Sequence, residues 1–323
     1  MEKSKKKART MFYLGVDIGG TKCAVSVGKV LDADIKILSR YEVPTTQNPY
    51  ETLGLLSEKV REYLNSYLIK RAGISCGGPL DSRQGIILCP PNLRGWENFP
   101  IVEYIEKEYG LKAKLENDAN ACALAEWRFG AGIGTKNMVF LTFGTGLGAG
   151  LILDGRLYAG TNGNAGELGH IHLARNGPIG FGKAGSFEGF CSGGGITRLA
   201  VQMAKRCKKT PKCILEMGGC DSVTTKKLSQ YAFAGDRFAK RVFEKSGRML
   251  GKGLSIVIDL LNPEKIVLGG VFMRSGELLI PSMRKEIARE SLWCNREVCE
   301  IVPAQLNENI GDIAAVAVAL LED

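Results

Sequence analysis

The sequence feature that most constrains the fold is a glycine-containing turn between two short apolar runs, which occurs near the start of each half of the chain. The first copy is YLGVDIGGTKCAVSVG, residues 13–28, and the second is NMVFLTFGTGLGAGLILDG, residues 137–155. Runs rich in Val, Ile and Leu that are separated by turn residues are typical of β-strands. Each copy is therefore predicted to be strand, turn and strand, and the repetition favours a duplicated architecture with a cleft between two lobes.

Strand and helix patterns alternate along the rest of the chain. Short apolar runs predict β-strands at residues 11–16, 22–28, 35–43, 72–76, 112–117 and 264–270. Apolar residues at three- and four-residue spacing predict helices at residues 50–70, 101–109, 187–206, 229–261 and 311–321, with one more starting at Asp118. This alternation favours an α/β fold with a largely parallel sheet.

Composition and charge narrow the class of protein. The chain has 323 residues, 45% of them hydrophobic, which suits one large or two medium globular domains. No apolar run is long enough to span a membrane, and the N-terminal MEKSKKKART lacks the apolar core of a secretory signal. Residues 1–10 read as a basic, flexible tail, and nothing downstream resembles a DNA-reading helix. A cytoplasmic protein without membrane or nucleic-acid partners is expected.

The ten cysteines include no C-x-x-C pair. In a cytosolic protein they read as reduced, small core residues. Cys207, Cys213 and Cys220 could form a metal knuckle, but their spacing is irregular and no histidine lies nearby, so this interpretation is the weaker one.

Three glycine clusters each end a predicted strand: Gly19–Gly20, Gly144–Gly150 and Gly269–Gly270. Any one of them could be an ordinary tight turn, but glycine also lets backbone N–H groups approach phosphate oxygens. Gly15 and Gly20 have P-loop spacing, yet the next residues are T-K where that motif needs K-[ST]. A dinucleotide site is also disfavoured, because no G-x-G-x-x-G opens a helix.

Four polar residues near these turns admit two interpretations each. Asp17 is either an Asx-turn residue or, beside bound phosphates, a residue that implies Mg²⁺, held directly or through water. Asp118 is either a helix cap or a general base that takes a proton from a hydroxyl. His170 and His172 are the only histidines, and either could be a packing residue; a zinc site lacks a nearby cysteine.

Seven ordered motifs resemble those of the ROK family of sugar kinases and related repressors. They are D-I-G-G-T-K (17–22), G-G-P-L-D (77–81), P-N-L-R-G-W (91–96), N-D-A-N (117–120), G-T-G-L-G-A-G (144–150), E-L-G-H (167–170) and G-G (269–270). The resemblance implies the two-lobed actin-like, ribonuclease-H-like ATPase fold with a central cleft. It also implies that the terminal helix packs on the small lobe, formed by residues 11–124 and 308–323, with 125–307 as the large lobe.

The resemblance also implies roles for individual residues. Asp118 would be the catalytic base. Sugar hydroxyls would be bound by Gly78, Asn92, Asn117, Glu167, His170 and Glu188. ATP phosphates and Mg²⁺ would be held by Asp17, Gly19, Gly20, Thr21, Lys22, Gly144, Thr145, Gly146, Gly269 and Gly270, with Asp17 on the metal side. In-line phosphoryl transfer mainly needs such positioning, charge neutralisation and a base.

One loop departs from the family pattern. Many members carry three cysteines after E-L-G-H that bind structural zinc, and this chain has Ile179, Phe181 and Ser186 at those positions. No zinc is therefore expected, and Ile179 and Phe181 are predicted to shape the loop by apolar packing.

The resemblance implies an ATP-dependent hexose kinase with glucose as the default acceptor. Fructose, mannose, allose and N-acetylhexosamines are alternative acceptors, and polyphosphate is an alternative donor. The resemblance leaves the oligomeric state open, although a homodimer is common in such kinases. A sugar-responsive repressor is disfavoured, because such members carry a helix-turn-helix of about 60 residues before the first strand and ten residues precede it here. A non-catalytic sugar or nucleotide sensor is disfavoured by the intact motifs.

Overall fold

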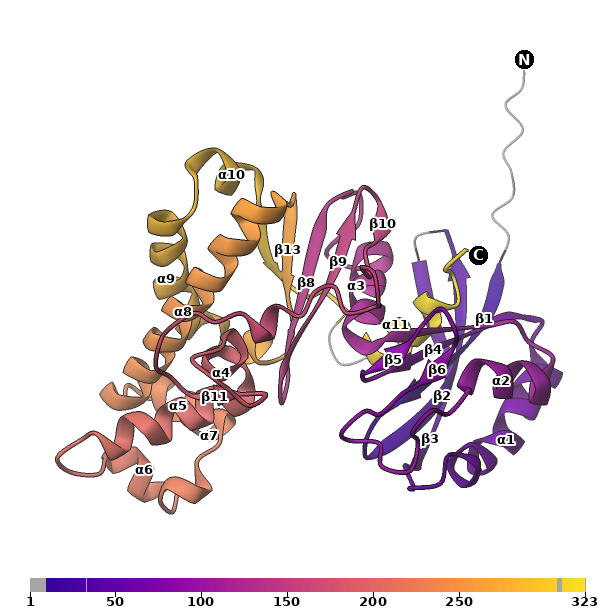
Figure 1. Cartoon of the computed structure of the whole chain (residues 1–323), viewed down its shortest axis with the longest axis horizontal. Helices are drawn as coiled ribbons and strands as arrows, with labels where there is room; N and C mark the ends of the chain where they lie inside the picture. The colour runs from indigo at the N-terminus through magenta and orange to yellow at the C-terminus, as the bar shows by residue number, and fades with distance from the viewer. Residues whose placement is uncertain (1–9, 33, 307–309, 323) are drawn as a thin grey trace. The chain divides into compact units, whose positions relative to one another are not determined.

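The computed structural model describes residues 10–32, 34–306 and 310–322 (Figure 1). The predicted basic tail therefore lies outside the described residues, apart from Thr10. Nowhere in the described ranges is a helix both long and apolar enough to cross a membrane.

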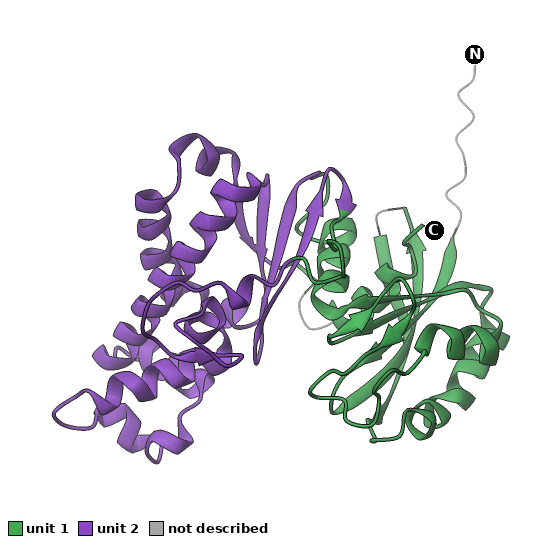
Figure 2. Cartoon of the chain, in the orientation of Figure 1, with its two compact units in different colours: residues 1–134, 157–165, 305–323 green, residues 135–156, 166–304 purple. Residues whose placement is uncertain are grey.

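The chain forms two compact units (Figure 2). Unit 1 contains residues 1–134, 157–165 and 305–323, and unit 2 contains residues 135–156 and 166–304. The predicted division into functional lobes, with bounds 11–124 plus 308–323 and 125–307, stays a proposal.

Unit 1 is built on a five-stranded sheet with the order β3-β2-β1-β4-β7. Its strands are β1 (Met11–Ile18), β2 (Lys22–Leu31), β3 (Asp34–Pro44), β4 (Ile69–Cys76) and β7 (Ala113–Asn117), with a small separate pair, β5 (Leu80–Asp81) and β6 (Ile86–Ile87). Its helices are α1 (Pro49–Ser66), α2 (Ile101–Tyr109), α3 (Asp118–Phe129) and α11 (Ile310–Val318). β1, β2 and β3 pair antiparallel, whereas β4 and β7 run parallel to β1.

Unit 2 repeats this arrangement, with the sheet order β10-β9-β8-β13-β14. Its strands are β8 (Met138–Phe143), β9 (Leu147–Leu153), β10 (Arg156–Leu157), β13 (Lys265–Leu268) and β14 (Glu300–Pro303), with a separate hairpin of β11 (Ile179–Gly180) and β12 (Lys183–Ala184). Its helices are α4 (Phe187–Cys191), α5 (Gly193–Lys205), α6 (Lys212–Glu216), α7 (Thr225–Phe233), α8 (Arg237–Leu261), α9 (Val271–Glu290) and α10 (Trp293–Val298), with 3₁₀ turns at Leu168–His170 and Cys220–Ser222. β8 and β9 pair antiparallel, and β13 is parallel to both β8 and β14.

The α/β class and the duplication are therefore confirmed, but the prediction of a largely parallel sheet is wrong. Each sheet combines an antiparallel half with a parallel half. The reason lies in the glycine turns, because a connection of a few residues can join only antiparallel neighbours, whereas parallel strands need a longer crossover.

The terminal helix α11 packs closely on the unit 1 sheet because glycines leave room for it. A Cβ on Gly73 would lie 2.1 Å from the carbonyl oxygen of Ala315, and a Cβ on Gly28 would lie 2.6 Å from a methyl group of Val316. Gly15 also faces Val316, at 3.0 Å. The first glycine of the apparent P-loop pattern therefore serves helix-to-sheet packing, and α11 has the partner that the family resemblance implied.

Three predicted helices end or break earlier than expected. The helix predicted at 50–70 ends at Ser66, because Ile69 already pairs with Phe12 of β1. The helix predicted at 187–206 breaks at Ser192, whose side chain accepts a hydrogen bond from the Gly195 N–H and caps α5.

The helix predicted at 229–261 breaks between Phe233 and Arg237. Gly235 has φ +97° and Asp236 caps α8 by accepting a hydrogen bond from the Ala239 N–H. Periodicity continues through such breaks, so apolar spacing alone does not reveal them.

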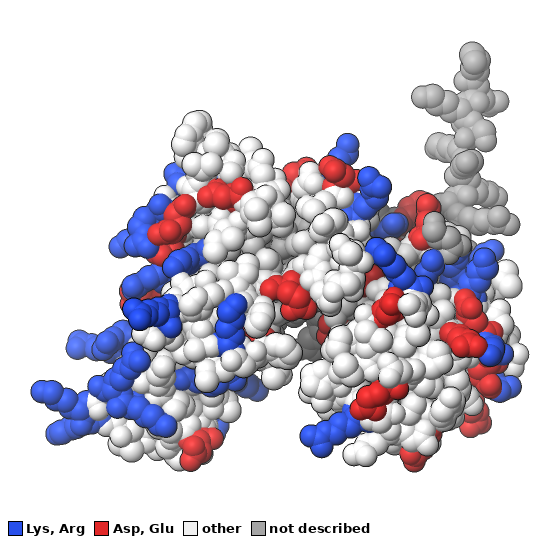
Figure 3. Space-filling model, in the orientation of Figure 1, with Lys and Arg blue, Asp and Glu red and all other residues white. Residues whose placement is uncertain are grey.

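Positive charge is concentrated in the helices of unit 2. Residues 198–252 carry 14 Lys and Arg against four Asp and Glu, a net +10, which exceeds the +9 of the whole chain. Lys and Arg gather over the region of α5 to α7 (Figure 3). The remainder of the chain is thus slightly acidic even though it includes the basic N-terminal residues.

Candidate active site

The predicted hairpin turn of unit 1 is confirmed, and five of the predicted site residues lie in it or directly beside it: Asp17, Gly19, Gly20, Thr21 and Lys22. Asp17 pairs with Ala24 near the end of β1, and the Gly19 N–H donates to the Lys22 carbonyl oxygen at 3.0 Å. The hydroxyl of Thr45 braces the turn by donating to the Gly19 carbonyl oxygen at 2.6 Å. The turn is therefore a fixed loop whose glycine backbone can approach a ligand closely.

Asn92, predicted to face the sugar, lies against this turn. A Cβ on Gly20 would lie only 2.7 Å from both the Cβ and the carbonyl oxygen of Asn92. A side chain at position 20 would therefore clash with the loop that carries Asn92, whether or not a ligand is bound.

The carboxylate of Asp17 lies in an acidic environment. Burial, followed by the nearby charges of Asp312 and Asp118, raises its pKa to about 6, and Arg40 opposes this shift. Gly311 lets α11 approach this carboxylate, because a Cβ there would be 3.1 Å from Asp17 Oδ2. A divalent cation would stabilise the ionised form of this carboxylate, because it would neutralise the local negative charge.

Lys22, the last residue of the D-I-G-G-T-K motif, forms an ion pair with Glu42 on β3, at 2.5 Å. Glu42 also pairs with Arg40 at 2.6 Å, and Arg40 pairs with Asp312 at 2.9 Å. The lysine therefore belongs to a chain of ion pairs that reaches the start of α11. Its predicted contact with the nucleotide stays a prediction.

Asn117 and Asp118 stand where β7 ends and α3 begins. Their Oδ1 atoms both accept from the Ala119 N–H, at 3.0 and 2.8 Å. Asp118 is exposed to solvent. Desolvation by the surrounding protein nevertheless raises the pKa of its carboxyl above the ordinary value. Asp118 thus accepts a hydrogen bond at the start of the helix and is also a perturbed, accessible carboxylate, and its role as a general base stays a prediction.

Two glycines bring a third loop to this pair. A Cβ on Gly78 would lie 3.3 Å from Asn117 Nδ2, and one on Gly77 would lie 3.9 Å from Asp118 Oδ2. Gly78, Asn117 and Asp118, which were predicted from separate motifs, are therefore neighbours within unit 1.

A buried carboxylate that the sequence did not reveal, Glu116, supports Asn117 from below. Glu116 is only 4% exposed, and its Oε1 accepts from the Asn117 N–H at 2.8 Å and from Asn120 Nδ2 at 3.0 Å. Desolvation by burial raises the pKa of the Glu116 carboxyl. Apolar spacing cannot show that Glu116, at the end of a strand, and Asn120, in the first turn of a helix, meet beneath the cap.

In unit 2 the two predicted glycine clusters lie side by side. Gly144, Thr145 and Gly146 form the turn between β8 and β9. Gly270 has φ +64° at the start of α9, and a Cβ there would be 2.3 Å from the Phe143 carbonyl oxygen, next to this turn. Gly269 instead continues the sheet, because its N–H donates to the Leu141 carbonyl oxygen at 2.8 Å.

The N-terminus of α5 also lies against the Gly144–Gly146 turn, which the sequence did not predict. The Gly193 N–H donates to the Gly144 carbonyl oxygen at 2.9 Å. A Cβ on Gly194 would lie 3.0 Å from Arg198 Nη1 and 3.1 Å from the Thr145 carbonyl oxygen. Helix N-termini, a glycine turn and a guanidinium form a favourable environment for phosphate. The S-G-G-G run at 192–195 was the signal that could have revealed this.

Glu188 connects the unit 2 turn to the E-L-G-H segment. Its Oε2 accepts from the Leu147 N–H at 3.0 Å, and its Cβ would lie 3.4 Å from a Cβ on Gly169. Glu167 and His170 flank this contact and are both exposed. Leu168–His170 is a 3₁₀ turn, and both His170 and His172 are exposed, so neither histidine is a buried packing residue.

The prediction of apolar packing by Ile179 and Phe181 is wrong as well. These side chains are 55% and 78% exposed. The loop is shaped by hydrogen bonds instead: the Gly185 N–H donates to the Pro178 carbonyl oxygen at 3.0 Å, and Lys183 Nζ donates to the His170 carbonyl oxygen at 2.8 Å. Within the described chain, no three His, Cys, Asp or Glu side chains are placed to share a metal ion.

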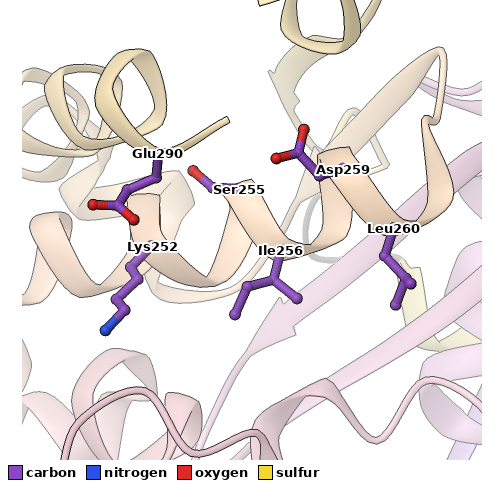
Figure 4. A pocket seen from close by; sticks show the side chains of 6 residues that line it. All are labelled: Lys252, Ser255, Ile256, Asp259, Leu260 and Glu290. Atoms are coloured by element: carbon purple, nitrogen blue, oxygen red, sulfur yellow. The ribbon is translucent and has the colours of Figure 1, made fainter. Parts of the chain in front are cut away.

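A surface pocket of about 370 Å³ lies elsewhere in unit 2 (Figure 4). Its lining residues are Lys252, Ser255, Ile256, Asp259, Leu260 and Glu290. Lys252 Nζ donates to the Leu173 carbonyl oxygen at 2.7 Å, and Asp259 accepts from the Leu292 N–H at 3.1 Å, so its polar groups serve the fold. None of the predicted site residues lines this pocket, and it is not the candidate site.

Two sheets of the same mixed order, each with a glycine turn between its first antiparallel pair, define a member of the actin-like ATPase class. A family model described as "ROK family" matches residues 13–322. The chain belongs to the ROK family.

Three relatives indicate the range of proteins to which the chain is similar. The glucokinase of Streptomyces coelicolor is 33% identical over 310 residues, covering 95% of this chain and 96% of that protein. The crystal structure of a ROK family glucokinase from Streptomyces griseus, in complex with glucose and AMPPNP, is 32% identical with a TM-score of 0.76 and covers 95% of this chain and 99% of that one. The DNA-binding transcriptional dual regulator NagC of Escherichia coli is 28% identical, covering 98% of this chain and 77% of the regulator.

Proposed function

We propose that this protein is an ATP-dependent hexose kinase and that glucose is its acceptor, phosphorylated to glucose 6-phosphate. The observation that carries the proposal is the Asp118 carboxylate, which is accessible, has a raised pKa and lies beside Gly77, while the preceding Asn117 lies beside Gly78. Similarity to glucokinases across nearly the whole chain supports this function.

Asp118 acts as general base. A carboxylate whose pKa is raised toward the working pH accepts a proton more readily from a hydroxyl as that oxygen attacks phosphorus. The start of α3 holds the carboxylate in place through the Ala119 N–H. Asn117, Glu167, His170, Glu188, Gly78 and Asn92 bind the remaining sugar hydroxyls, and a mismatched sugar leaves some of these groups unpaired.

Backbone N–H groups hold the phosphates of ATP. The donors belong to the turns at Gly19–Thr21 and Gly144–Gly146 and to Gly270, where glycine permits close approach. Lys22 adds its side-chain ammonium to this set. Gly269, whose N–H is bonded within the sheet, approaches the nucleotide beside Gly270. These groups stabilise charge on the transferred phosphoryl group without any covalent chemistry of their own.

Mg²⁺ is the metal that this donor set fits. Hard carboxylate oxygen is its preferred ligand, and it commonly uses one carboxylate together with water and substrate phosphates. Asp17 would hold it, directly or through water, and the raised pKa caused by burial and neighbouring carboxylates supports this assignment. When bound, the ion supplies neutralisation of phosphate charge.

A sugar kinase with another acceptor is the nearest alternative, and a non-catalytic sugar-sensing regulator is the second, supported by the similarity to NagC. A panel assay separates them. Purified protein is given glucose, mannose, fructose, allose, N-acetylglucosamine or N-acetylmannosamine with ATP or polyphosphate, and release of ADP and formation of sugar phosphate are measured. Glucose with ATP should give the highest kcat/KM. Turnover of another sugar alone would correct the acceptor, and sugar binding without turnover would favour the sensor.

A further inference from the structure

The tip of the β11–β12 hairpin carries an aromatic side chain in an unfavourable place. Phe181 and Gly182 form its two-residue turn with φ values of +43° and +74°. Turns of this kind favour Asn, Asp or Gly, because a Cβ at positive φ is strained. The Phe181 ring is also 78% exposed. Strain and exposure together mean that the folded chain alone does not account for phenylalanine here.

The hairpin is attached to the segment that carries His170. The rings of Phe181 and His170 lie 6.3 Å apart between centroids, with planes at 82°, in an edge-to-face arrangement. Lys183, at the start of β12, donates from Nζ to the His170 carbonyl oxygen at 2.8 Å, and the His170 N–H donates to the Glu167 carbonyl oxygen at 3.1 Å. The phenyl ring is therefore held beside His170, one of the residues proposed to bind the acceptor.

We propose that Phe181 is a sugar-contacting residue that covers the apolar C–H face of the acceptor pyranose while His170 and Glu167 bind its hydroxyls. This inference rests on the proposed function. The π face of an aromatic ring is negative and attracts the weakly positive C–H groups of a sugar, and burial of both surfaces adds an apolar contribution. A contact of this type favours sugars whose covered face has no axial hydroxyl.

Ile179 provides the matched comparison within the same hairpin. It is 55% exposed, so its removal also takes away an exposed apolar side chain, but no ring contact joins it to His170. If the hairpin acts in a general way, substitution at either position should change the KM for glucose. If Phe181 contacts the sugar, only its substitution should do so.

The test compares Phe181→Gly, Phe181→Asn, Phe181→Tyr and Ile179→Ala with the wild type. KM for glucose, KM for ATP, Tm and oligomeric state by sedimentation are measured for each. Phe181→Gly and Phe181→Asn should raise the KM for glucose about tenfold, leave the KM for ATP unchanged and keep or raise Tm, since both residues tolerate positive φ. Phe181→Tyr and Ile179→Ala should match the wild type.

A glucose KM within twofold of wild type in folded Phe181→Gly and Phe181→Asn overturns the contact while the kinase proposal stands. A change of oligomeric state without a change in glucose KM also overturns it and assigns the tip to self-association. If the wild type turns over no sugar, the kinase proposal fails separately. Equilibrium sugar binding to the wild type and Phe181→Gly then decides the contact, and absence of binding to the wild type overturns it.

Discussion

Units 1 and 2 share one sheet arrangement but carry opposite electrostatics. In both, a glycine turn joins the central antiparallel pair, β1–β2 or β8–β9. Near the first turn are the carboxylates Asp17 and Asp118, both with raised pKa values. Near the second are the N-termini of α5 and α9 and the guanidinium of Arg198. The same kind of turn thus lies beside carboxylates in one unit and beside helix N-termini and a guanidinium in the other.

The groups that surround each turn, rather than the turn itself, therefore decide its chemistry. A carboxylate beside other carboxylates is destabilised unless it binds a proton or a cation. Helix N-termini with glycine instead offer N–H groups to an anion. If this difference is functional, variants of the unit 1 carboxylates should affect turnover and pH dependence, and variants around the unit 2 turn should affect the KM for ATP.

The largest effect is expected for Asp118→Asn in unit 1. Loss of the base should lower kcat by about 10²–10⁴-fold while sugar and ATP still bind, since general-base catalysis contributes on this scale. Single-turnover kinetics and equilibrium binding check this. Asp34→Asn, an exposed residue at the start of β3, is the control and should be fully active. Near-normal turnover of Asp118→Asn would remove the base from the proposed mechanism.

Asp17→Asn should weaken the use of Mg²⁺ and at the same time stabilise the fold. Because the folded pKa is about 6 and the ordinary value is 3.8, the fold prefers the protonated carboxyl. This preference is fully present below about pH 4 and is lost as the pH rises through about 6.

At pH 7 the variant should therefore resist unfolding better than the wild type, by at most about 3 kcal/mol because water screens a partly exposed group. Urea unfolding at pH 4 and pH 7 measures this difference. Equal gains at both pH values would contradict the raised pKa, and an unchanged Mg²⁺ requirement would contradict the metal assignment.

Two glycines of unit 2 should respond differently to alanine. Gly270→Ala places a Cβ 2.3 Å from the Phe143 carbonyl oxygen at positive φ, so unfolding should become easier by about 1–3 kcal/mol. Gly144→Ala has no atom within 4 Å of the added Cβ, so Tm should not change while the KM for ATP rises. An unaltered ATP KM in Gly144→Ala would mean that phosphate does not approach this turn.

The smallest effect is expected for Arg198→Ala. Loss of a guanidinium beside Thr145 should raise the KM for ATP about tenfold, the scale of one charge-assisted hydrogen bond, and leave the KM for sugar unchanged. Arg206→Ala, an exposed arginine at the end of α5, is the matched control. A similar rise in both variants would indicate general electrostatic attraction to the basic helices rather than a specific contact, and higher salt would then abolish it.

Local patterns predicted most of the elements. The hairpin turn at 17–22, the strand at 72–76 and the start of α3 at Asp118 follow from apolar runs and turn residues, which depend on near neighbours in sequence. The breaks at Ser192 and Gly235 were missed because caps interrupt helices without altering their apolar spacing. α9 and β14 were not predicted at all.

The sequence by itself determined the α/β class, the duplicated strand–turn–strand units and the family, because these depend on local patterning and on motif order. The tertiary structure alone decided that Gly78 adjoins Asn117, that Arg198 and Thr145 both flank Gly194, and that Phe181 is exposed beside His170 instead of packed. The first two contacts join residues that are distant in sequence, and the exposure of Phe181 depends on which side of its loop faces solvent. The spacing of residues in the sequence predicts neither kind of feature, because each depends on how whole helices and strands pack.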